Sequence, residues 1–148
     1  MPAQARALST LPQIDYEDAF LVDVGPTQCQ TAEQWARQVL EFAPASERRS
    51  LLRGWSAIGL KVGCRRSGED VLGWQIRRSM PDCVLLGAAS RIGLPGELLF
   101  QRHAGRLLFC TFVRQENPAA RTVWARIEAT HVRTIRRLLE QASQRGRP

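Results

Sequence analysis

The sequence of 148 residues predicts a single α+β domain, in which an antiparallel β-sheet is covered by one long helix at the C-terminal end. Two observations predict this fold class. From residue 70 onward the apolar residues recur with a period of two, which is typical of β-strands. After Asn117–Pro118 they recur at helical spacing as far as about Ser143. The helix can bury its apolar stripe best across the concave face of the sheet, so we expect the two elements to pack together.

The first third of the chain predicts one strand followed by two short helices. Residues 15–24 alternate loosely and end at a Gly-Pro pair, as a strand does. Thr31 is the predicted N-cap of a helix over 31–43, and Ser46 is the predicted N-cap of a helix over 46–60. Because the link between these helices is short, the chain must turn sharply there. The buried face of the second helix is predicted to consist of Leu51, Leu52, Trp55 and Ile58.

The middle of the chain predicts an antiparallel meander of at least four strands, over residues 71–78, 81–90, 96–103 and 106–114. The segment 81–90 is almost continuously apolar, as a strand covered on both faces would be. The dipeptide Ala104–Gly105 between the last two strands predicts a β-hairpin turn. Cys83 and Cys110 lie within these strands, where a free cysteine usually acts as a small hydrophobic residue.

The apolar stripe of the long helix contains one ionisable residue, His131. One interpretation is a neutral core imidazole that is bonded to a carbonyl or hydroxyl group. The other is a polar group that faces a cavity, where it orients a ligand or acts as an acid or base. The sequence leaves both open. The neighbours of His131 on the stripe are Trp124, Ile127, Ile135 and Leu138, whereas Arg126, Arg133 and Arg137 lie opposite.

The domain boundaries follow from where these patterns begin and end. Residues 1–13 are expected to be a disordered tail, 14–144 a single domain, and 145–148 a disordered C-terminus. The first 13 residues lack the continuous hydrophobic stretch of a secretory signal. No apolar run approaches the ~20 residues that span a bilayer. We therefore predict a cytoplasmic protein without integral membrane association.

The charge and the cysteines exclude several classes of site. The formal net charge of +7 comes from scattered arginines, with no zinc finger, RNA-binding motif or helix-turn-helix beside them, so we predict no nucleic-acid partner. The four cysteines include no CxxC pair and form no zinc pattern with the two histidines. The sequence therefore predicts no metal and no cofactor. It leaves open whether the protein forms a homodimer.

Several segments resemble a bacterial branch, known only as a domain of unknown function, within the START-like or SRPBCC superfamily. They are DYEDAF (15–20), TAEQWAR (31–37), VLGWQI (71–76), TFVRQENPAARTVWA (111–125) and THVRTIRRLL (130–139). The resemblance implies a helix-grip fold, in which a curved sheet is wrapped around the C-terminal helix with an internal cavity between them. In that superfamily the cavity holds lipids, sterols, polyketides, hormones or other apolar molecules. Some members bind or carry them, and others are cyclases or components of hydroxylating enzymes.

These observations lead to the hypothesis that the protein binds a small apolar or amphipathic molecule in its interior. One alternative is a cyclase- or hydrolase-type enzyme that uses the same cavity, although no catalytic residue is evident. Another is an interaction module that uses its basic surface. Arg114 and Arg121 are either solvated surface residues or an anion grip at the cavity mouth. The candidate ligand-binding residues are Trp55, Trp74, Ile76, Leu99, Phe109, Trp124, Ile127, His131, Ile135 and Leu138.

Overall fold

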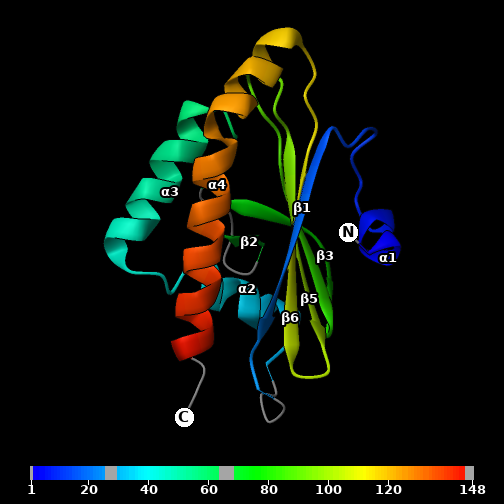
Figure 1. Ribbon diagram of the computed structural model, residues 1–148, viewed down its shortest axis with the longest axis vertical. Coiled ribbons are helices and arrows are strands. Elements are labelled where there is room, and N and C mark those ends of the chain that lie inside the picture. Colours follow the sequence, from blue (N-terminus) through cyan, green and yellow to red (C-terminus); the bar gives the residue numbers. More distant parts are fainter. Residues whose placement is uncertain (1, 26–29, 64–68, 146–148) are drawn as a thin grey trace.

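The computed structural model describes residues 2–25, 30–63 and 69–145, and Figure 1 shows an α+β fold. All neighbouring strands are antiparallel, in the order β1-β6-β5-β4-β3-β2. The strands are β1 (Tyr16–Asp23), β2 (Asp70–Val71), β3 (Trp74–Met80), β4 (Cys83–Ala88), β5 (Gly96–His103) and β6 (Arg106–Val113). The helices are α1 (Ala3–Ala7), α2 (Ala32–Leu40), α3 (Ala45–Ala57) and α4 (Pro118–Arg145).

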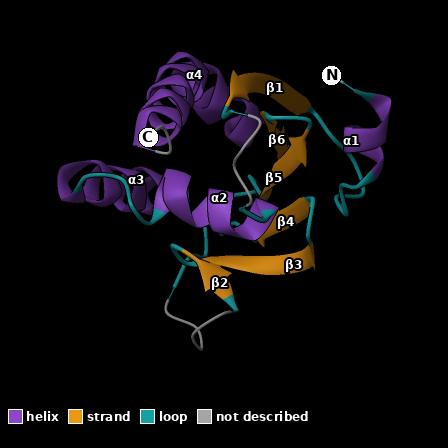
Figure 2. Cartoon of the chain, turned by 90° about the horizontal axis from the view of Figure 1, so that it is seen from below, coloured by secondary structure: helices purple, strands orange, loops and turns teal. Residues whose placement is uncertain are grey.

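The sheet curves around α2 and α4, whereas α1 lies on its outer side (Figure 2). Alternate strand residues point to these two sides. On the inner side, Phe100 and Phe109 pack edge to face with ring centroids 5.0 Å apart, in one core cluster with Leu138 of α4. On the outer side, Leu85 and Phe112 belong to a second cluster. Both faces of β4 are thereby covered, as its continuous apolar run predicts.

Helix α4 packs on the inner side of the sheet through its apolar stripe. Its buried residues include Ile135, Leu138, Leu139 and Ala142. At its start, the Asn117 side-chain oxygen accepts the Ala120 N–H at 2.8 Å, so the Asn-Pro pair provides a cap for the first turn. The predicted α+β fold class is confirmed, and the arrangement is compatible with a helix grip. None of the helices within the described ranges is long and apolar enough to cross a membrane.

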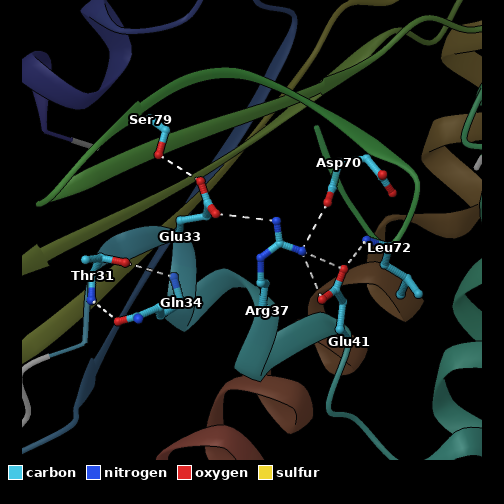
Figure 3. Close-up of polar contacts among 8 residues, drawn as sticks. All are labelled: Thr31, Glu33, Gln34, Arg37, Glu41, Asp70, Leu72 and Ser79. Carbon is cyan, nitrogen blue, oxygen red and sulfur yellow. Dashed lines mark hydrogen bonds and ion pairs between the residues drawn. The ribbon is translucent and has the colours of Figure 1, made fainter. Parts of the chain in front are cut away.

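Helix α2 begins at the predicted N-cap and is fixed to the β2–β3 hairpin by polar contacts (Figure 3). Thr31 and Gln34 form a capping box, in which each side chain accepts the other's backbone N–H. Arg37 pairs with Glu41 at 3.0 Å and also donates to the Asp70 carbonyl. The Glu41 carboxylate accepts the N–H of Leu72 at 3.1 Å. The guanidinium and its carboxylates therefore hold α2 against the hairpin turn.

Two predicted elements differ from the structure. Helix α3 begins at Ala45 after Pro44, so Ser46 is inside the helix and does not cap it. The strand predicted over 71–78 is divided into β2 and β3 by a turn at Leu72–Gly73, where both residues have positive φ. This turn is stabilised because the Asp70 carboxylate accepts the Gly73 N–H at 2.8 Å.

The N-terminal segment differs from the expected disordered tail. Of residues 1–13, those described form α1 and a stretch without regular secondary structure, whose Leu8 and Leu11 pack on the outer side of the sheet. Ala5 is fully buried there, beside Leu99 and Phe112. At the other end of the chain, α4 includes Arg145, and the rest of the predicted C-terminal tail, 146–148, lies outside the described residues.

A buried carboxylate holds the N-terminal segment in place. Glu97 of β5 is fully buried, and its side chain accepts the Ser9 hydroxyl and the Thr10 N–H, the latter at 3.0 Å. Arg77 of β3 donates to the same carboxylate at 2.9 Å. Since a buried charge requires partners, Glu97 is tied to both the N-terminal segment and β3.

Candidate functional site

A cavity of about 330 Å³ lies on the inner side of the sheet, between the sheet, α3 and α4. This volume is within the range of small-molecule sites, roughly 300–1,000 Å³. Its wall is mainly apolar, with hydroxyl and charged groups on the helices. The residues that line it include Glu47, Ser50, Leu51, Gly54, Trp55, Ala57, Ile58, Trp74, Leu94, Leu98, Thr111, Trp124, Ile127, Thr130, His131, Thr134, Ile135 and Arg137.

The cavity exists because α3 does not pack closely on the rest of the core. Leu51 is the buried residue of this helix. The side of α3 that lines the cavity carries the small residues Ser50, Gly54 and Ala57, all of which are exposed. A Cβ added at Gly54 would meet no atom within 4 Å. Small side chains on this face therefore leave space that larger ones would fill.

Three tryptophans from different elements line the cavity: Trp55 of α3, Trp74 of β3 and Trp124 of α4. Trp55 of α3 and Trp74 of β3 meet edge to face, with ring centroids 5.4 Å apart. Trp124 of α4 lies against Tyr16 of β1 at 4.8 Å and against His131 at 5.2 Å. The wall thus provides flat apolar surfaces, which suit an apolar or aromatic group.

His131 lies in this wall and is hydrogen-bonded to the sheet. Its Nε2 is 3.0 Å from Asp18 Oδ2 and 3.1 Å from Thr111 Oγ1. The Asp18 carboxylate also accepts the Tyr16 hydroxyl at 2.8 Å and the Thr111 N–H at 3.1 Å. The ring is therefore both a satisfied polar group beside the core and part of a cavity wall.

The geometry of this cluster limits its chemistry. Because Nε2 faces a carboxylate, this nitrogen carries the proton of a neutral ring. The same nitrogen faces Thr111, so it has no lone pair with which to take the proton of that hydroxyl. A catalytic triad places the carboxylate and the nucleophile on opposite ring nitrogens. The cluster is thus arranged to orient the His131 ring and not to activate Thr111 as a nucleophile.

Tyr16 should report on the Asp18 cluster at alkaline pH. Burial and the hydrogen bond to Asp18 raise the pKa of Tyr16 well above its ordinary value, and burial raises that of Cys110 to about 12. The folded state holds the Tyr16 and Cys110 protons more tightly than the unfolded state does. The contribution of these two groups to stability is therefore complete below their unfolded-state pKa values. It is lost progressively as the pH rises above them.

Tyr16 is the only tyrosine in the chain, so phenolate absorbance at 295 nm follows it alone. We expect no titration near pH 10 in the folded wild type and a lower apparent pKa in Asp18→Asn. A Tyr16 titration midpoint near pH 10 in the wild type, at a pH where circular dichroism shows that the protein is still folded, would contradict the hydrogen bond between Tyr16 and Asp18.

The cavity opens to solvent between α3 and α4, where its lining residues are exposed. An ion pair bridges the two helices there: Arg137 donates from Nε and Nη2 to the two oxygens of Glu47, at 2.9 and 3.0 Å. Half of the Arg137 side chain is exposed. One turn away, Arg133 donates to the hydroxyl of Thr130 at 3.2 Å. The mouth therefore carries the Arg137 guanidinium and the Glu47 carboxylate, and the Arg133 guanidinium lies next to it at the Thr130 hydroxyl.

Six of the ten predicted residues lie in the cavity wall. They are Trp55, Trp74, Trp124, Ile127, His131 and Ile135. Ile76, Phe109 and Leu138 pack on the same side of the sheet but do not line the cavity. Leu99 is on the opposite side, in the cluster with Ala5, so its assignment to the cavity is wrong.

Other residues of the site were not predicted. Asp18 and Thr111 complete the His131 cluster, but they come from strands far from His131 in the sequence. The mouth is formed by Glu47 and Arg137, not by the suggested pair Arg114 and Arg121, which do not line the cavity. A single glutamate on α3 and an arginine on α4 are a weak sequence signal, because the pair is evident only once the two helices are placed side by side.

Within the described ranges, no group of three or more histidine, cysteine or acidic side chains is placed to hold a metal ion. Cys83 and Cys110 are free thiols in the sheet core, and burial raises the pKa of both. Cys29 and Cys64 lie outside the described residues.

Comparisons with known proteins found no matching family model and no matching curated protein. One similar solved structure is that of the Mll3558 protein from Rhizobium loti. It is 12% identical in sequence, with coverage of 87% of this chain and 97% of that chain, and the TM-score is 0.35. A likeness at this level supports no statement about function.

Proposed function

We propose that the protein binds a small apolar or amphipathic molecule in the cavity between the sheet, α3 and α4. The observation that carries the proposal is the cavity itself, because its tryptophan-rich wall leaves a volume of about 330 Å³ unfilled by side chains. Membership of the SRPBCC superfamily, as the sequence resemblance implies, is part of the same proposal.

Apolar walls favour a ligand over water. At about 30 Å³ per molecule, the cavity would hold on the order of ten waters. Those next to Trp74, Leu94 and Trp124 would have few hydrogen-bond partners, so an apolar group that displaces them gains free energy. Burial of apolar ligand surface is worth roughly 25 cal/mol per Å² before the cost of association is subtracted.

The polar groups of the wall would set the orientation of the ligand. His131 is fixed by Asp18 and Thr111 through Nε2, so its position varies little. A fixed polar group beside apolar walls is the usual composition of a binding site for an amphipathic molecule. Catalysis requires, in addition, a base or nucleophile within reach of the ligand, and the Asp18 carboxylate is already engaged by three donors. Binding is therefore the function that the geometry supports best.

The proposal is tested by titration with N-phenyl-1-naphthylamine, a neutral dye whose fluorescence rises in apolar surroundings. We expect saturable binding of one dye per chain. In Gly54→Phe the added ring enters the open space beside Gly54, and we expect the dissociation constant to rise at least about tenfold.

Gly54→Ala is the matched control, since its methyl group occupies little of the cavity. It should bind the dye nearly as the wild type does and should raise the free energy of unfolding by about 0.5–1 kcal/mol, because Gly54 is inside a helix. Failure of the wild type to bind the dye, or equal binding by Gly54→Phe, would refute the proposal.

A further inference from the structure

The polar groups at the cavity mouth suggest what kind of molecule enters it. Exposed lining residues mark where the cavity opens: Ser50, Gly54 and Ala57 on α3, and Thr130 and Arg137 on α4. Figure 1 shows these two helices side by side. A ligand with its apolar part among the tryptophans would place its other end between these helices.

The mouth offers hydrogen-bond donors of positive charge. Arg137 lines the cavity directly, and Arg133 is positioned by its bond to Thr130, which also lines it. Guanidinium groups pair with carboxylates, sulfonates and phosphates through two parallel hydrogen bonds.

The bidentate pair between Arg137 and Glu47 shows that such an anion fits this place. The two oxygens of Glu47 accept hydrogen bonds from Nε and Nη2 of Arg137. A ligand carboxylate would bind the guanidinium with the same geometry. Half of the Arg137 side chain is exposed, and that of Glu47 is 19% exposed, so water screens the arginine side of the pair and the attraction between the two groups is modest. An anion with an apolar tail anchored in the cavity can therefore replace Glu47 at low cost.

We infer that the ligand is an anionic amphipath, whose acidic head is bound at the mouth by Arg137 and Arg133 while its apolar part lies in the cavity. The inference rests on the proposed function and adds the class of ligand. Glu47 acts in it as a competitor that holds Arg137 in position in the absence of the ligand. The head can be that of a lipid or fatty acid, and a free inorganic anion shares its charge but not its tail.

Two dyes that differ by one group test this inference. 1-Anilinonaphthalene-8-sulfonate is N-phenyl-1-naphthylamine with an added sulfonate, so the ratio of the two dissociation constants isolates the contribution of the acidic head. We expect the sulfonate dye to bind at least threefold more tightly. Glu47→Gln, which frees Arg137, should lower the dissociation constant of the sulfonate dye about threefold or more and leave that of the neutral dye unchanged. Arg133→Gln should weaken the sulfonate dye by a similar factor.

Arg121→Gln is the matched control, because it removes the same charge from an exposed arginine in the first turn of α4, twelve residues before Arg133. We expect it to change neither dissociation constant by more than about 1.5-fold once salt screens long-range fields at 0.15 M. Sodium sulfate, compared with sodium chloride at equal ionic strength, should not displace the sulfonate dye at millimolar concentration. Circular dichroism and thermal unfolding of each variant verify that it is folded.

The outcomes separate this inference from the proposed function. If neither dye binds, the proposed function fails and the inference fails with it. If the neutral dye binds but the sulfonate dye binds no better, or does not respond to Glu47→Gln and Arg133→Gln, the cavity is a binding site but not for an anionic amphipath. If Arg121→Gln weakened binding of the sulfonate dye as much as Arg133→Gln does, or if sulfate alone displaced this dye, the assignment of the acidic head to the cavity mouth would likewise be overturned.

Discussion

Glu97→Ala should lower the free energy of unfolding by about 3 kcal/mol. Removal of one partner from a buried ion pair usually costs about 3–5 kcal/mol. The lower end is expected because Arg77, which would lose its partner, is 26% exposed and can be solvated. The hydroxyl of Ser9 and the N–H of Thr10 also lose their acceptor. Urea denaturation followed by circular dichroism measures the change.

Release of the N-terminal segment is a separate consequence of Glu97→Ala. With its carboxylate anchor lost, this segment should detach from the outer side of the sheet more often, so that trypsin cleaves after the exposed Arg6 faster than in the wild type. Glu97→Gln is the control: its amide oxygen still accepts the Thr10 N–H, and we expect roughly half of the destabilisation. A loss under about 1 kcal/mol in Glu97→Ala, with no faster cleavage, would show that Glu97 does not hold the segment.

Asp18→Ala has the second largest expected effect, again about 3 kcal/mol. The carboxylate accepts three hydrogen bonds, from Tyr16, Thr111 and His131. A buried donor left without an acceptor costs roughly 1–3 kcal/mol, and cavity water can replace the acceptor for His131. The loss should therefore exceed that of any single hydrogen bond in the cluster.

Tyr16→Phe is the control for this prediction, since it removes one donor and leaves the carboxylate with the other two. We expect a loss of about 1 kcal/mol, measured by urea unfolding as for Asp18→Ala. Similar losses in the two variants would mean that Asp18 contributes little beyond its bond to Tyr16, and the description of His131 as a fixed group would have to be abandoned.

Local chemistry explains which parts of the fold the sequence predicts. The hairpin at Ala104–Gly105 needs positive φ at both residues, and the chain offers a short side chain and a glycine there. The start of α2 is encoded by Thr31 and Gln34, three residues apart. In both cases the interacting groups are neighbours in the sequence, so pattern is sufficient.

Contacts between distant segments explain what the sequence did not predict. The run Leu98–Leu99–Phe100 has no alternation, so the face of Leu99 is decided by its pairing opposite Cys110 of β6. The N-terminal segment is ordered by Glu97, 87 residues after Thr10. Neither partner carries a local signal of this contact.

The site was predicted in part for the same reason. Spacing on one helix brings Trp124, His131 and Ile135 to one side, and the structure agrees. The buried face predicted for α3 is less buried than expected, with Leu52 exposed by 39% and Trp55 partly exposed beside the cavity. Whether a helix leaves a space beneath it depends on how its small residues face the sheet, and periodicity does not report that.

The most direct test of the central claim is a structure of the protein with N-phenyl-1-naphthylamine bound, determined by crystallography or by nuclear Overhauser effects from dye protons to side chains. We predict contacts with the side chains of Trp74, Trp124 and Ile135 and none with Ala5. Contacts confined to Ala5 and the outer side of the sheet, with the space beneath α3 unoccupied, would contradict the account.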